Sequence, residues 1–354
     1  MKEEMKFVRH QQVSQLFHNK FIVVLGDSIQ RCVYKDLVLL LQKDEYLRLA
    51  QLKRKGEMSF EQDRLMEGGC LNFMHNGTGY REVRQYQSPH HLVRFYFVTR
   101  VYSDYMKSIM EDFYRGLKPD LVIVNSCVWD ISRYNSKWEA GYKDNLIKFF
   151  EELLCVLPEE SLVIWNLTMP LGERIKGGFL VPEISHKAGH LRHDVIEANF
   201  YSGLLAQDCK LDVLDLHFHF RHCLRHRAAD GVHWNALAHR RISTLLVLHA
   251  ADAWGVDLPL NSLADISVAH LLPGLESERR VVRPPRTNWS PRPPLGDFTN
   301  FYVDPAALHY AVDYAPYSHH GWPPAYYDEP LVMRTRRARY QYMPYTHHRP
   351  HQHY

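Results

Sequence analysis

The sequence lacks several features that define whole classes of protein. None of its 354 residues lies in an apolar run of about 18, so the sequence predicts no transmembrane helix. The segment before Phe21 is charged at its start and has no apolar stretch, unlike a secretory signal peptide. The six cysteines are scattered and none are spaced as CxxC, which argues against a disulfide framework or a zinc ribbon. We therefore expect an intracellular protein, cytoplasmic or nuclear.

Most of the chain also lacks an excess of positive or negative residues. The formal net charge is only +3, too small to make nucleic acid the default partner. From Glu276 onward the chain has ten Arg, no Lys and seven acidic residues, which leaves 33 basic and 33 acidic residues in 1–275. The positive excess therefore belongs to the C-terminal segment.

That C-terminal segment is poor in the apolar runs that build a core. It holds 12 of the 19 prolines, which remove backbone donors, and 10 of the 21 tyrosines. We predict a folded domain at 1–272 and a Pro-, Tyr-, His- and Arg-rich disordered tail at 273–354. Arginines and tyrosines in 334–345 can stack on single-stranded RNA, and the Pro-rich piece 290–294 can bind a protein groove. An inert solvated tail is the alternative.

Residues 1–272 alternate short apolar runs with longer amphipathic segments. Such runs suit parallel strands covered on both faces, and the alternation predicts repeated βαβ units. We therefore expect a three-layer α/β/α fold around a mostly parallel, five-stranded sheet. The predicted strands are Phe21–Leu25, Val93–Thr99, Leu121–Asn125, Leu162–Asn166 and Leu211–Leu216, and the predicted helices are Ser103–Gly116, Tyr142–Leu157, His186–Gln207 and Asn235–Trp254. Active sites of such sheets lie beyond the carboxyl ends of the strands.

Two short motifs follow the first and the last predicted strands. Gly26-Asp27-Ser28 allows a sharp turn out of the sheet, with Ser28 at the start of the next helix as a nucleophile or as a helix cap. Asp230 and His233 lie three apart, so the carboxylate can orient the imidazole, although a capped helix with a surface histidine has the same pattern. One parallel sheet would bring both motifs to the same edge.

These motifs resemble the PC-esterase branch of the GDSL/SGNH hydrolase superfamily. The similar stretches are GDSIQR at 26–31, HNGTGYREVRQ at 75–85, LVIVNSCVWDISRY at 121–134, DVLDLHFHFRH at 212–222 and DGVHWNALAHR at 230–240. The resemblance covers about residues 15–260 and implies a flavodoxin-like fold with a Ser-Asp-His triad. It assigns Ser28 as nucleophile, His233 as base and Asp230 as its orienting carboxylate.

The resemblance also implies an oxyanion hole, but the residues expected to form it match the family pattern only in part. Asn125 and Trp129 fit the Asn-Thr-Gly-His-Trp segment of the branch, but Cys127 replaces its glycine and Val128 its histidine. Arg31 fits a GDSxxR pattern and could donate to a developing oxyanion. Gly77 and Gly79 are both candidate backbone donors. Asn125 could instead bond the next loop, and Trp129 could simply pack in the core.

A second group of histidines precedes the Asp230 motif. In an extended chain His217 and His219 would share one side, the arrangement of two zinc ligands. No matching third ligand is evident, and the family uses no metal. We expect no metal and no cofactor.

The leading hypothesis is a serine esterase or acyl transferase that acts on a small acylated substrate, such as an O-acetylated sugar. The alternatives are a catalytically impaired SGNH-like binding or scaffold protein and an interaction protein that works through its tail. Hydrolysis and transfer use one triad and differ only in what attacks the acyl-enzyme.

Overall fold

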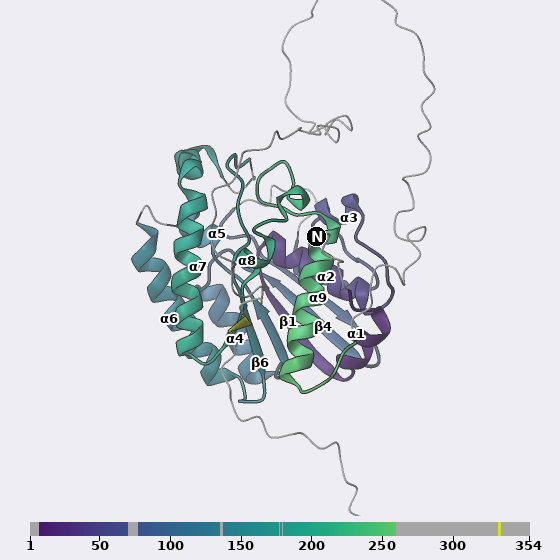
Figure 1. Cartoon of the computed structure of the whole chain (residues 1–354). Helices are drawn as coiled ribbons and strands as arrows, with labels where there is room; N and C mark the ends of the chain where they lie inside the picture. Colours follow the sequence, from purple (N-terminus) through teal and green to yellow (C-terminus); the bar gives the residue numbers. More distant parts are fainter. Residues whose placement is uncertain are drawn as a thin grey trace, which may run out of the picture. The chain divides into compact units, whose positions relative to one another are not determined.

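A single mixed sheet organises the part of the chain that the structure describes. This computed structural model describes residues 7–69, 77–134, 137–176, 178, 180–259 and 332–333. The sheet has eight strands in the order β2-β3-β4-β1-β5-β6-β7-β8 (Figure 1). In chain order the strands are β1 Lys20–Gly26, β2 Arg64–Gly68, β3 Glu82–Gln87, β4 His91–Phe97, β5 Leu121–Val124, β6 Leu162–Asn166, β7 Asp212–Leu214 and β8 Val332–Met333.

The five strands expected from the sequence form the parallel centre of this sheet. β4, β1, β5, β6 and β7 are neighbours in that order and all pair in parallel. The sheet is larger than the expected five strands because β2, β3 and β8 pair antiparallel at its two ends. β2 is mostly exposed, and β3 carries charged and polar side chains, so neither forms the apolar run that marks a central strand.

Helices cover both faces of the parallel centre, as expected for a three-layer α/β/α fold (Figure 1). Residues of α1, α2 and α9 pack on one face, and residues of α4, α5, α6 and α7 pack on the other. The helices are α1 His10–Leu16, α2 Ser28–Leu40, α3 Leu49–Lys53, α4 Asp104–Arg115, α5 Val128–Arg133, α6 Trp138–Val156, α7 Leu191–Asp208, α8 Leu216–Phe220 and α9 Ala236–Ala253, with 3₁₀ turns η1 Pro182–Gly189 and η2 Leu224–His226.

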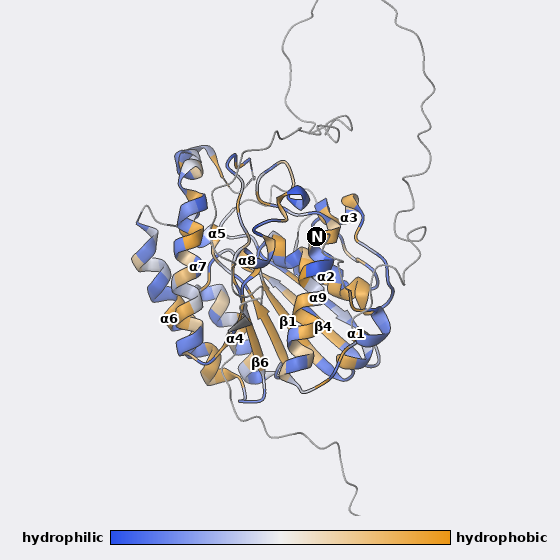
Figure 2. Cartoon of the chain, viewed as in Figure 1, coloured by the Kyte–Doolittle hydropathy of each residue, from blue (hydrophilic) through white to orange (hydrophobic). Residues whose placement is uncertain are grey.

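The alternation of side chains along β1 explains why the core has two halves. Ile22 and Val24 join the cluster under α2 and α9, whereas Phe21, Val23 and Leu25 join the cluster under α4 to α7. Successive side chains of a strand point to opposite faces, so an uninterrupted apolar run fills both halves. Figure 2 shows the resulting hydrophobic centre of the sheet.

The segment after β7 differs from its expected conformation. His217 and His219 were expected on an extended chain, but they lie in the short helix α8. Asp215 caps this helix, because its carboxylate accepts a hydrogen bond of 2.8 Å from Phe218 N. The extended-chain argument for paired metal ligands was therefore wrong. No group of three or more His, Cys, Asp or Glu side chains suited to a metal ion occurs among the described residues.

The boundary expected near residue 273 stays a prediction. Apart from the two residues of β8, which pair with β7, the predicted tail at 273–354 lies outside the described residues. Within the described part of the chain, no helix is both long and apolar enough to span a membrane.

One buried ion pair joins α2 to α9. Arg240 Nε donates to Asp36 Oδ2 over 3.0 Å, and both side chains are almost completely buried. Because Arg240→Ala would leave a buried carboxylate without its cation, we predict a loss of about 3–5 kcal/mol in the free energy of unfolding. Urea denaturation measures it. Lys107→Ala, which breaks an exposed pair with Asp104, is the control and should cause no measurable change. Equal losses of unfolding free energy in Arg240→Ala and Lys107→Ala would show that the buried pair is no more important for stability than the exposed one.

Candidate active site

The sharp exit from β1 depends on Gly26. Its φ is +154°, and a Cβ atom there would lie 2.3 Å from Gln30 Cγ and 2.6 Å from the carbonyl oxygen of Asn125. A side chain at this position would therefore collide with α2 and with the end of β5. Glycine lets the chain pass directly from the sheet into α2.

Ser28 is the first residue of α2, and Asp27 before it caps the helix. The Asp27 carboxylate accepts a hydrogen bond of 2.8 Å from Ile29 N. The Ser28 hydroxyl lies 2.8 Å from Nε2 of His233, which is 205 positions away in the sequence. The sequence left open whether Ser28 caps the helix, and the structure gives that role to Asp27.

Asp230 orients the ring of His233 from the other side. Its Oδ2 lies 2.6 Å from His233 Nδ1, and its Oδ1 accepts the backbone N–H groups of Val232 and His233, each over 2.9 Å. Burial raises the pKa of the Asp230 carboxyl, but these hydrogen bonds and the nearby imidazole outweigh burial and hold the pKa well below its usual value. Because the carboxylate accepts the Nδ1 proton, Nε2 is left to accept from Ser28.

The loop that carries Asp230 and His233 is fixed by backbone hydrogen bonds to the segment after β6. Gly172 N donates to Gly231 O over 2.7 Å, and Lys176 N donates to Asp230 O over 2.8 Å. Gly172 also allows a close approach, because a Cβ there would lie 2.8 Å from Gly231 Cα. The position of the imidazole therefore depends on contacts with a segment that is distant in sequence.

Arg31 lies one turn after Ser28 and makes a buried ion pair. Its Nη1 donates to Glu82 Oε2 over 2.9 Å, and Tyr80 also donates to Glu82 Oε2, over 2.6 Å. Burial raises the pKa of the Glu82 carboxyl, but Arg31 and Tyr80 outweigh burial and lower it below its usual value. Glu82 thus holds Arg31 in place, and the expected oxyanion role of Arg31 stays a prediction.

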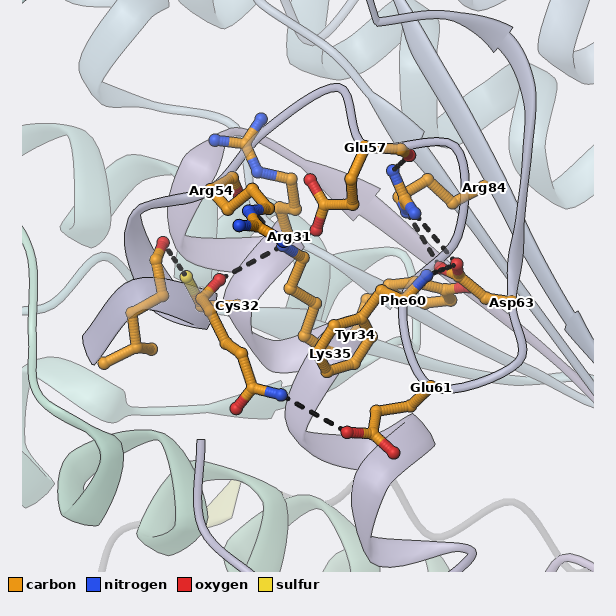
Figure 3. Close-up of polar contacts among 12 residues, drawn as sticks. Arg31, Cys32, Tyr34, Lys35, Arg54, Glu57, Phe60, Glu61, Asp63 and Arg84 are labelled. Atoms are coloured by element: carbon orange, nitrogen blue, oxygen red, sulfur yellow. Dashed lines mark hydrogen bonds and ion pairs between the residues drawn. The ribbon is translucent and has the colours of Figure 1, made fainter. Parts of the chain in front are cut away.

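Further buried charges continue from this pair beneath α2 (Figure 3). Arg84 makes a bidentate ion pair with Asp63, with both N–O distances 2.8 Å. Tyr34 donates to the same carboxylate over 3.0 Å. Lys35 pairs with Glu57, whose backbone carbonyl accepts from Arg84. Sequence reasoning missed this network, because charged residues are usually exposed. The sequence feature that could have indicated it is the pair of opposite charges Glu82 and Arg84, which occupy alternate positions of β3 and therefore share one face of the sheet.

Asn125 and Trp129, the side-chain candidates for the oxyanion hole after β5, both make structural contacts. The side-chain amide of Asn125 donates to Asn166 O over 2.8 Å and to Thr168 Oγ1 over 3.0 Å, so it links the end of β5 to the end of β6 and the residues that follow it. Trp129 is buried in α5, with its ring edge-on to Phe97. These contacts agree with the structural alternatives that the sequence allowed for both residues.

Gly77 and Gly79 lie in an exposed turn before β3. The carbonyl oxygen of Thr78 between them accepts a hydrogen bond of 2.7 Å from Thr99 Oγ1. A Cβ at either glycine would meet nothing within 4 Å, so packing does not distinguish the two candidates. Their role as backbone donors stays a prediction.

A buried carboxyl in α5 was also missed from the sequence. Both oxygens of Asp130 accept the backbone N–H of Val101, over 3.0 and 3.1 Å, and Oδ2 accepts the Ser126 hydroxyl over 2.5 Å. Burial raises the pKa of Asp130 to about 7, although these hydrogen bonds oppose the shift. Asp130 joins the loops that follow β4 and β5.

The chain is similar in sequence to PC-esterase domain-containing proteins. No family model matches the chain. Human PC-esterase domain-containing protein 1A is 59% identical over 261 residues, which are 73% of this chain and 58% of the human protein. Human PC-esterase domain-containing protein 1B is 52% identical over 286 residues, 80% of this chain and 65% of that protein. The chain is a relative of the PC-esterase domain-containing proteins. It spans less than two thirds of the length of these two relatives.

Solved structures resemble this PC-esterase relative more distantly. A putative acylhydrolase from Bacteroides fragilis is 15% identical with a TM-score of 0.41, and covers 69% of this chain and 94% of its own. An acetylxylan esterase from Geobacillus stearothermophilus is 13% identical with a TM-score of 0.36, and covers 66% of this chain and 95% of its own.

The raised pKa of Asp130 predicts a specific pH dependence of stability. Between about pH 4 and pH 7 the native carboxyl keeps a proton that the unfolded chain has released. Asp130 should therefore lower the free energy of unfolding by about 1.4 kcal/mol for each pH unit in this window as the pH rises. Relative to Asp130→Asn, the wild type should lose stability from pH 4 to 7 and no further above it.

Urea denaturation at several pH values measures the difference between the wild type and Asp130→Asn. Asp104→Asn removes a carboxylate that is almost fully exposed and serves as the control. Parallel pH profiles of the wild type and Asp130→Asn would show that Asp130 is ionised in the native state throughout.

Proposed function

We propose that this chain is a serine esterase or acyl transferase that acts on a small O-acyl ester. The observation that carries the proposal is the continuous hydrogen-bonded chain from Asp230 through His233 to Ser28. In this proposal Ser28 is the nucleophile, His233 is the general base, and Asp230 holds the imidazole in the tautomer whose Nε2 can accept a proton. The kinship with PC-esterase domain-containing proteins supports it.

The proposed reaction has two steps. Ser28 Oγ attacks the acyl carbonyl carbon while its proton moves to His233 Nε2, and the imidazolium then protonates the departing alcohol. The acyl-enzyme formed on Ser28 is attacked in turn by a second nucleophile, whose proton again goes to His233. Water at this step gives hydrolysis, and the hydroxyl of an acceptor such as a sugar gives transfer.

The developing oxyanion needs donors at the same edge of the sheet. The backbone N–H of Ser28 itself, at the N-terminus of α2, is one candidate donor. Arg31 is a further candidate, because a guanidinium carries five N–H groups and the ion pair with Glu82 engages its Nη1. Asn125, Trp129, Gly77 and Gly79 remain the weaker candidates.

A binding or scaffold protein is the second candidate function. It is favoured by one observation: the Asn125 amide, expected in an oxyanion hole, is committed to Asn166 and Thr168. Cys127 and Val128, which depart from the family pattern, are buried beside it. In a binding or scaffold protein, the hydrogen bonds from Asp230 through His233 to Ser28 would be kept although the protein turns over no acyl substrate. Protein or RNA partners of the tail belong to this alternative.

Covalent labelling distinguishes the two functions. We predict that a fluorophosphonate probe labels the wild-type chain and that Ser28→Ala abolishes labelling with a nearly unchanged melting temperature, because the hydroxyl is the attacking group. Ser108→Ala, in an exposed position of α4, is the matched control and should label normally. Intact-protein mass spectrometry measures the adduct. Folded wild-type protein that never reacts would favour the scaffold function instead.

A further inference from the structure

The outer edge of β7 is paired with a segment from the far end of the chain. β7 is the last parallel strand of the sheet, and β8 pairs antiparallel with it, with Val213 opposite Met333 and Leu214 opposite Val332 (Figure 1, β8 in yellow). An unpaired strand edge presents free backbone donors and acceptors to any extended peptide. The chain thus supplies its own strand to this edge.

An apolar groove of about 260 Å³ lies beside the same strand. Val213, which pairs with Met333, lines it together with Leu167. Its other wall is a row of exposed side chains at four-residue steps on α7. These are Ile196, Phe200 and Leu204, which are 51%, 61% and 43% exposed. Large apolar side chains grouped this way on a helix face favour contact with another segment.

A second hollow, of about 180 Å³, lies at the start of β7. Glu159, Lys210 and Leu211 are among the residues that line it. Three exposed acidic residues are close in sequence to this lining: Glu159 and Glu160 in the loop before β6, and Asp208 at the end of α7. Because β8 is antiparallel to β7, Met333 is the β8 residue that lies nearer this end of β7. Four arginines follow within six residues: Arg334, Arg336, Arg337 and Arg339.

We propose that the β7 edge, with the groove along α7 and the acidic residues near its start, is the docking site for this chain's own segment 330–340. The segment extends the existing β8 pairing in both directions, with apolar residues before it and arginines after it. Continuity with β8 and the complementary charge of the arginines and these acidic residues favour this occupant over a second copy of the chain. The proposal does not depend on the function of Ser28.

Photo-cross-linking in the full chain tests this docking site. The photoreactive analogue p-benzoylphenylalanine replaces Phe200, in the groove, or Tyr114, which is 67% exposed on α4 and serves as the control. Isotopically labelled and unlabelled chains are mixed before irradiation, so that mass spectrometry separates links within one chain from links between chains. We expect position 200 to link to residues 330–340 of the same chain, and position 114 not to do so.

A proline substitution then tests whether β8 holds the segment. Val332→Pro removes a backbone donor from the strand and should reduce the links from position 200 to the control level. Val312→Pro, elsewhere in the C-terminal segment, should leave them unchanged. Links mainly between chains would make a second copy the occupant. Absence of links to 330–340, or links that survive Val332→Pro, would equally overturn the proposal.

Discussion

The hydrogen bond between Ser28 Oγ and His233 Nε2 is the contact on which the proposed chemistry depends. It joins two residues 205 positions apart, and no local feature of either segment produces it. The parallel sheet brings the end of β1 and the loop beyond β7 to the same edge. Gly26 then permits the tight exit into α2, and the hydrogen bonds from Gly172 and Lys176 fix the opposing loop. The 2.8 Å contact between the hydroxyl and the imidazole therefore depends both on the exit from β1 and on the fixed position of the opposing loop.

The parallel centre of the sheet could be predicted because its strands are apolar on both faces. The flanking strands could not, since β2 and β3 carry charged and polar side chains that interrupt any apolar run. The role of Ser28 also could not be decided from its motif, because Asp27 and Ser28 are both good helix caps and only the structure shows which of them caps. The alternation of His217 and His219 with phenylalanines favoured an extended chain, but Asp215 caps a short helix at this position.

The buried charges beneath α2 show a different limit of sequence reasoning. Arg31, Arg84 and Glu82 would ordinarily be assigned to the surface, yet all three are buried and paired. Burying such charges costs several kcal/mol for each ion, so a network of this kind is weak evidence for stability. Its geometric effect is clearer, because it fixes the side of α2 that bears Arg31, one turn from Ser28. The helix that presents the proposed nucleophile is thereby held in a defined position.

The most direct test of the proposed triad is the effect of Asp230→Asn on kcat with a small ester such as p-nitrophenyl acetate. Asparagine can still accept the N–H groups of Val232 and His233, so the loop should keep its conformation. Its amide would face Nδ1 as a donor and favour the wrong imidazole tautomer. We predict a fall in kcat of about 10⁴, as in serine proteases, with an unchanged fold by circular dichroism. A fall of less than about tenfold would contradict the triad and leave Asp230 as a loop cap.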